Sequence, residues 1–154
     1  MRRRIVLIAL VVFIALAGAA GWAHHRASQR DAAVRQSLST ATAAAQALFS
    51  YDYRSFDTSV ANGRGFTTGD FAKQYEQTTA ALKASAVKEQ AVVRASVSAT
   101  GVVSATERRV ELLLYLNQYR RNANITGEKV DQNRVVLTLV RVGAEWKVTD
   151  ATAI

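Results

Sequence analysis

The sequence contains no cysteine and no proline, and only 8 of its 154 residues are glycine. Without cysteine no disulfide can form, so an exported domain must be stabilised by its hydrophobic core. Beyond residue 23 the chain also lacks a polybasic run or a basic stretch interleaved with aromatics, which argues against nucleic-acid binding. It shows no internal repeats, and its length suits a single folded domain.

Charged residues are absent from one long segment near the N-terminus. Residues 5–23 read IVLIALVVFIALAGAAGWA, an apolar run of 19 residues. As a helix this run spans about 28 Å, close to the roughly 30 Å hydrocarbon core of a bilayer. Arg2, Arg3 and Arg4 precede it, so the positive-inside rule predicts a transmembrane helix with a cytoplasmic N-terminus.

Trp22, His24 and His25 lie at the outer end of the run, where amphipathic side chains favour the membrane interface. A cleaved signal peptide is the alternative, with a small-residue cleavage site at residues 17–19. The apolar run is longer than the usual core of about 7–15 residues and continues past that site, which favours a retained anchor. We therefore expect a single-pass protein of the cell (inner) membrane with an extracytoplasmic, or periplasmic, C-terminal domain.

The expected organisation is a cytoplasmic basic end (residues 1–4), a transmembrane helix (5–23), a helical stalk (24–35) and an extracytoplasmic domain (36–154). Small residues gather in the outer half of the anchor, and such surfaces let helices pack closely in lipid. The candidate packing residues are Ala15, Ala17, Gly18, Ala19 and Gly21. An alanine-rich anchor without a packing role is the alternative.

The net charge is +8, and the three N-terminal arginines account for part of it, which leaves +5 beyond residue 23. These remaining charges are interspersed along the chain, which is typical of a solvated surface. Attraction to anionic headgroups or to a cell-wall surface is the alternative reading.

Neither glycine nor proline interrupts residues 22–61, and residues 41–47 read ATAAAQA. Alanine is the strongest helix former, so we predict a helix that continues from the anchor and stops at Gly63 and Gly65. Apolar residues three or four apart mark its buried face: Val34, Leu38, Ala41, Ala45, Leu48, Phe49, Phe56 and Val60. A second helix is predicted from the capping hydroxyls of residues 67–68 to about residue 85, with three inward residues: Phe71, Tyr75 and Leu82.

Beyond the second helix, the apolar period changes from about 3.6 to 2. Four strands are predicted, at residues 91–103, 110–119, 134–142 and 145–150. The second of them is apolar on both faces, which suggests a strand covered on both sides for part of its length. Helices followed by a strand meander predict an α+β fold, with helices packed on a curved antiparallel sheet of about four strands.

Three segments together resemble the actinobacterial Mce-associated membrane proteins. They are residues 49–75 with a Tyr-Asp-Tyr helix and a Thr-Gly-Asp-Phe helix start, residues 115–118 (YLNQ), and residues 135–150 with a closing Gly-x-x-Trp hairpin. The resemblance implies a cone-shaped domain of the nuclear transport factor 2-like, or ketosteroid-isomerase-like, type. It also implies an accessory role beside Mce complexes, which transport lipids or sterols, while similar anchored cones serve as scaffolds in type IV secretion and conjugation.

Asp52 is the acid that the pattern places nearest the buried stripe, four residues after Leu48. In an apolar pocket its pKa would rise, and it could act as a base. The alternative is an edge position, with Asp52 bonded to a backbone amide or paired with Arg54 or Arg120. We favour the alternative because no motif adds a second acid, a histidine or a nucleophile.

No metal site or cofactor is predicted either, because two adjacent histidines without further ligands do not make a metal centre. Several aromatics could line a lipid-sized cavity in the cone: Tyr51, Tyr53, Tyr75, Tyr115, Tyr119 and Trp146.

The leading hypothesis is a non-catalytic accessory subunit whose partners are other membrane subunits of an Mce-type lipid-transport complex. The alternatives are a lipid- or sterol-binding module, a scaffold of a type IV secretion or conjugation complex, and a cryptic enzyme using Asp52. The sequence leaves the oligomeric state open.

Overall fold

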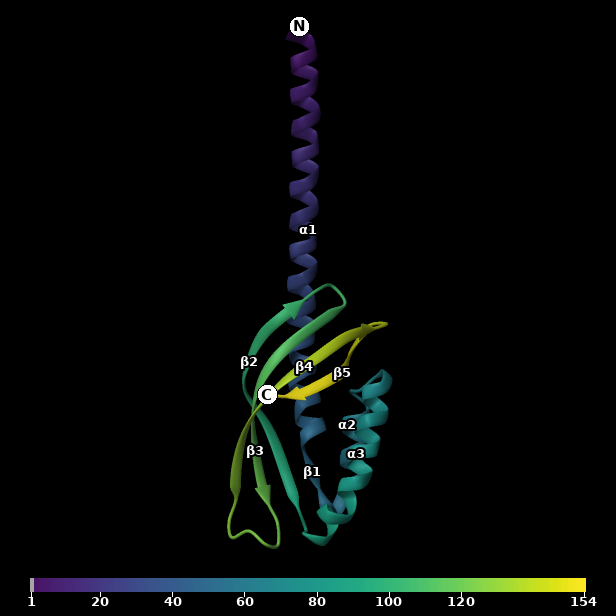
Figure 1. Cartoon of the computed structure of the whole chain (residues 1–154), viewed down its shortest axis with the longest axis vertical. Coiled ribbons are helices and arrows are strands. Elements are labelled where there is room, and N and C mark those ends of the chain that lie inside the picture. The colour runs from purple at the N-terminus through teal and green to yellow at the C-terminus, as the bar shows by residue number, and fades with distance from the viewer. Residues whose placement is uncertain (1) are drawn as a thin grey trace.

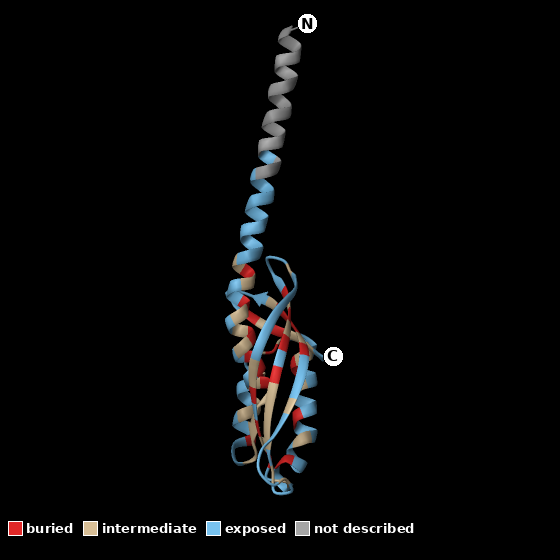
Figure 2. Ribbon diagram, turned by 90° about the vertical axis from the view of Figure 1, so that its left-hand side faces the viewer, coloured by how far each residue is buried: buried red, intermediate tan, exposed pale blue. Residues whose placement is uncertain are grey.

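Helix α1 (Arg2–Phe49) is one unbroken helix of 48 residues, and it extends far beyond the rest of the fold (Figure 1). The computed structural model describes the chain from residue 2 to residue 154, and its side chains at residue 18 and from residue 21 onward. Side chains 21–31 of α1 are exposed, and Ala33 is the first buried one (Figure 2). The absence of proline and the high alanine content explain why the helix does not break.

Within the residues whose side chains are described, no helix has a stretch long and apolar enough to cross a membrane. Most of the predicted span at residues 5–23 lies outside those residues. The same is true of the topology and packing residues Arg2, Arg3, Arg4, Ala15, Ala17 and Ala19. The predicted anchor therefore stays a prediction.

The rest of the chain is α+β, as predicted. After α1 come β1 (Tyr51–Asp52), the 3-10 helix η1 (Tyr53–Ser55), α2 (Phe56–Arg64), α3 (Gly69–Lys88), β2 (Val92–Ala105), β3 (Arg109–Arg121), β4 (Lys129–Val142) and β5 (Glu145–Ala153). The strands form one antiparallel sheet in the order β1-β2-β3-β4-β5. The sheet has five strands rather than about four, because the short β1 pairs with the start of β2.

The C-terminal half of α1 forms the core with one face of the sheet. Its buried residues are small: Ala33, Ser37, Ala41, Ala44 and Ala45, followed by Leu48. Large residues come from the sheet instead: Val110, Leu112, Leu114, Leu116, Val135, Leu137, Leu139, Trp146 and Val148. Small side chains on the helix let it lie close to the sheet, most closely along β2, and full burial of each core leucine contributes about 1.5–3 kcal/mol.

The predicted continuous helix to residue 61 is wrong at residues 50–55. The hydroxyl of Ser50 accepts a hydrogen bond from the amide of Ala95 at 2.9 Å, and Asp52 accepts one from the amide of Arg54 at 2.9 Å. Serine and aspartate favour such local bonds over helix continuation. The break lets Tyr51 pair with Val93 as part of β1 and turns the chain back into α2.

Two further predictions differ from the structure. In the described residues β3 is covered on one face only, since Tyr115 is 43% exposed and Leu113 is half-buried. Thr68 is the N-cap residue of α3, but its side chain makes no capping bond, and the hydroxyl of Thr67 donates to the carbonyl of Arg64 at 2.9 Å. The amide of Thr68 instead donates to the carbonyl of Val148 at 2.9 Å, which ties the α2–α3 loop to β5.

Gly63 marks a close approach between α2 and α3. A methyl group on Gly63 would overlap the hydroxyl of Tyr75, lie 2.8 Å from its ring carbon Cζ and 3.0 Å from the carbonyl oxygen of Ala47. The tyrosine ring is rigid and the carbonyl belongs to α1, so neither can yield easily. Glycine at position 63 therefore permits the packing of three helices.

Gly63→Ala should lower the free energy of unfolding by about 1–3 kcal/mol, the usual penalty for overpacking. Gly101→Ala in β2 is the control, because nothing lies within 4 Å of its added methyl group. Urea unfolding of the full chain in detergent, followed by the fluorescence of the buried Trp146, measures both. Equal stability of the two variants would contradict the steric argument.

Candidate functional site

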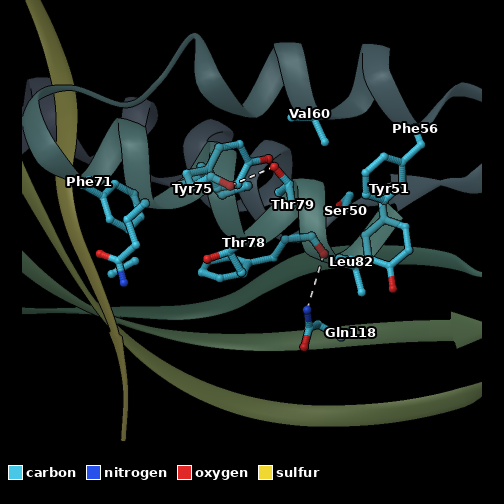
Figure 3. Close-up of a pocket in the computed structure, with 14 residues that line it drawn as sticks. Ser50, Tyr51, Phe56, Val60, Phe71, Tyr75, Thr78, Thr79, Leu82 and Gln118 are labelled. Atoms are coloured by element: carbon cyan, nitrogen blue, oxygen red, sulfur yellow. Dashed lines mark hydrogen bonds between the residues drawn. The ribbon is translucent and has the colours of Figure 1, made fainter. Parts of the chain in front are cut away.

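An apolar cavity of about 340 Å³ lies between the helices and the sheet, with Leu48 and Phe49 at the end of α1 in its lining (Figure 3). One face of α3 provides six of its fourteen lining residues, spaced alternately three and one apart: Phe71, Gln74, Tyr75, Thr78, Thr79 and Leu82. The remaining lining comes from Leu48, Phe49, Ser50, Tyr51, Phe56, Val60, Gln118 and Ala151. The cavity thus begins where α1 ends.

Polar groups in the wall are mostly used by the protein itself. The side-chain amide of Gln118 donates to the carbonyl of Phe49 at 3.4 Å and accepts from the side chain of Asn133 at 2.7 Å (Figure 3). The hydroxyl of Thr79 donates to the carbonyl of Tyr75 at 2.8 Å. Gln118 therefore links the sheet to the end of α1, a role that the YLNQ segment alone did not reveal.

Two tyrosines give the cavity its only phenol groups among the described lining residues. Burial raises the pKa of Tyr75, and burial also raises the pKa of Tyr51, where nearby Arg120 acts in the opposite direction. The ring of Tyr51 packs edge-to-face against Phe56, with centroids 5.4 Å apart. The described lining contains no acid, histidine, lysine or arginine, so the cavity is mainly apolar and its polar groups are hydroxyls and amides.

Asp52 does not line this cavity. Its carboxylate accepts from Nε of Arg54 at 2.9 Å and from Nη2 at 2.5 Å, as well as from the Arg54 amide. These bonds lower the pKa of Asp52 to about 2. This geometry matches the alternative in which Asp52 is paired with Arg54. A general base needs a carboxylate that is free to take up a proton, and the carboxylate of Asp52 is held by these bonds instead.

The predicted interface residues lie on the exposed part of α1. Trp22 is 59% exposed, and the guanidinium of Arg26 lies 3.9 Å from its ring centroid, a cation–π contact. His25 lies 3.4 Å from the side chain of Gln29, and His24 is exposed. In the described part of the chain, no group of three potential ligands is placed to hold a metal ion.

The other aromatics named from the sequence are divided by the fold. Tyr51 and Tyr75 reach the cavity, Trp146 is buried in the core, and Tyr115 faces outward. Thr78 and Gln118 were missed, because a polar residue on a cavity wall has no sequence pattern that separates it from a surface residue.

No family model matches the sequence. Two uncharacterized proteins of Mycobacterium tuberculosis, one of them Rv1362c of strain H37Rv, are 27% identical over 159 residues, covering 96% of this chain and 70% of theirs. These relatives leave the resemblance to the Mce-associated family as a prediction.

Solved structures share the fold. CagV, a VirB8 homologue of the type IV secretion system of Helicobacter pylori, superposes with a TM-score of 0.62 at 13% identity, covering 75% of this chain and 93% of CagV. An IcmL-like type IV secretion system protein of Legionella pneumophila gives 0.61 at 16% identity, covering 75% and 88%. The periplasmic domain of DotI gives 0.60 at 20% identity, covering 76% and 91%. The fold is VirB8-like.

The Asp52–Arg54 pair can be tested by titration. In carboxyl carbon NMR, Asp52 should titrate with a pKa of about 2, and Arg54→Gln should move it toward the ordinary 3.8. Because the pKa of Asp52 is lower in the folded state, the ion pair contributes its full stabilisation above pH 3.8. This stabilisation is lost as the pH falls through about 2. Arg120→Gln is the control and should leave the titration unchanged, since Arg120 pairs with Asp131. An ordinary pKa for Asp52 in the wild-type chain would contradict the ion pair.

Proposed function

We propose that this chain is a non-catalytic assembly subunit of a multi-subunit complex in the cell envelope. One membrane helix would hold it in the inner membrane, with the N-terminus in the cytoplasm and the α+β domain outside. The fold supports this proposal, since CagV and the IcmL-like protein, which share it, are described as type IV secretion components. The ion-paired Asp52 and a cavity whose described lining has no acid, histidine, lysine or arginine also favour a role other than catalysis.

The observation that carries the proposal is the continuity of α1. The helix runs from Arg2 to Phe49, and packing against the domain starts only at Ala33. Its exposed stretch at residues 21–31 is therefore about 16 Å long at 1.5 Å per residue. A helix without a hinge would transmit the position and orientation of a membrane anchor directly to the domain, which suits a component of an ordered assembly.

Two kinds of complex are compatible with this role. A scaffold position in a type IV secretion-like complex is favoured by the structural neighbours. An accessory position in an Mce-type lipid- or sterol-transport complex follows from the sequence motifs and would use the same anchor and domain. The proteins that co-purify with the chain distinguish the two.

Affinity purification of the full chain from gently solubilised membranes should recover other membrane subunits. Ala15→Leu with Ala19→Leu should reduce this recovery severalfold, because large side chains on the small-residue face keep partner helices apart. Ala9→Leu with Ala20→Leu is the matched control, with the same chemistry on a different face of the helix. Reproducible recovery of the protein alone would overturn the assembly role, and equal loss in both pairs would remove the small-residue face from it.

A second candidate function, a lipid- or sterol-binding module, is supported by the apolar cavity. Native mass spectrometry of the full chain released from detergent should then show a bound lipid-sized molecule. Thr78→Phe should abolish that adduct, because Thr78 is an exposed residue at the cavity wall and the larger ring would fill the space. Gln77→Phe, also exposed but outside the lining, is the control. A wild-type chain that carries no adduct would count against this function.

A further inference from the structure

Three arginines converge where the sheet meets the exposed stretch of α1. Arg26 and Arg30, one helical turn apart, line a surface hollow of about 520 Å³ together with Arg108 and its turn neighbours Ala105, Thr106 and Glu107. Both views of the ribbon place the tip of the β2–β3 hairpin beside α1, as the part of the sheet nearest its exposed stretch (Figures 1 and 2). We call this site the arginine hollow.

The turn that carries Arg108 is fixed by hydrogen bonds. The amide of Thr106 donates to the carbonyl of Arg109 at 2.8 Å, and the hydroxyl of Thr106 accepts from the amide of Arg109 at 3.0 Å. The carbonyl of Arg108 accepts from the amide of Arg141 at 2.9 Å, which ties the turn to β4. The backbone of Arg108 is therefore held at a defined position facing α1.

The charges of the hollow are not neutralised from within. Arg54, Arg64, Arg109, Arg120 and Arg121 each form an ion pair. In the described part of the chain, none of the three arginines of the hollow lies within ion-pairing distance of a carboxylate. Glu107 lines the hollow, and Asp31 follows Arg30 on α1. The three arginines outnumber these two acids, so the site keeps a positive excess. Convergent guanidinium groups of this kind bind phosphate and carboxylate groups well.

The position of the hollow selects the kind of anion. If the membrane helix ends at Ala23, Arg26 and Arg30 lie about 4–11 Å above that end along the helix. The headgroup layer on each side of a bilayer is roughly 5–8 Å thick, and charges interact over about 8 Å at physiological salt. Trp22 lies beneath Arg26, and the exposed Val103 on the same hairpin adds an apolar group. Basic and apolar groups together are typical of a surface in contact with lipid.

We propose that the arginine hollow binds the phosphate group of an anionic phospholipid and so seats the domain on the membrane surface. The inference rests on the proposed membrane anchor, which supplies the height of the hollow. Binding on one side of α1 would also restrict rotation and tilt of the domain, which an anchor alone does not do.

The experiment compares the full chain in nanodiscs of phosphatidylcholine alone and with phosphatidylglycerol added. Hydrogen exchange at residues 105–109 should slow by about fivefold when the anionic lipid is present, and this effect should vanish at 1 M salt, where the screening length is about 3 Å. A triple variant that combines Arg26→Gln, Arg30→Gln and Arg108→Gln should abolish the slowing of exchange by the anionic lipid. The control is Lys88→Gln with Arg94→Gln and Lys129→Gln, which removes the same charge from three exposed residues elsewhere on the domain.

The possible results separate this inference from the proposed function. A chain that does not enter the discs would overturn the anchor and, with it, the lipid assignment. A chain that enters them but shows no dependence on phosphatidylglycerol, or an equal loss in both triple variants, would overturn the lipid site and leave the anchor intact. Equal protection by inorganic phosphate in phosphatidylcholine discs would assign the hollow to a soluble anion instead.

Discussion

The packing of the small face of α1 against the sheet is the interaction on which the rest of the structure depends. Ala41, Ala44 and Ala45 are fully buried there, against leucines that are also fully buried. Because the helix brings little side-chain volume, it can lie close to the sheet and remain straight. The same helix continues out of the domain, so one element forms the core and also determines how the domain is held relative to the N-terminal segment.

The cavity follows from the way in which α1 ends. At Phe49 the helix stops, and the bonds made by Ser50 and Asp52 redirect the chain into β1 and α2. Beyond that point α3 lines the space beside the sheet. The leftover volume is lined by α3 on one side and bounded by Gln118 on the other. A helix continuing to residue 61 would have occupied part of this space.

Periodicity predicts much of this fold and little of its sites. The helical period placed Ala41, Ala45 and Leu48 in the core, and the period of two located four of the five strands. It failed at residues 50–55, where local side-chain bonds override helix propensity, and on the outer face of β3, since an apolar pattern cannot tell whether another layer covers it.

Contacts between residues distant in sequence were beyond the reach of periodicity. Gly63 meets Tyr75 between two helices, and Arg108 lines the same hollow as Arg30 from a turn that lies far along the chain. Such contacts depend on how complete elements pack, which a local pattern does not record. The candidate site was therefore predictable only in part, through the inward face of α3 that carries Phe71, Tyr75 and Leu82.

The location of the cavity bears on the choice between an assembly role and a lipid-binding role. Leu48 in the cavity wall lies 25 residues beyond Ala23, so with the predicted anchor the cavity would be about 38 Å from the end of the membrane helix. A lipid leaving the bilayer could not reach it without crossing water along the length of the domain, which strongly opposes transfer of apolar surface. A cavity at that height would have to receive its ligand from another protein. Both functions therefore require a partner in the envelope, and assembly is the role that they share.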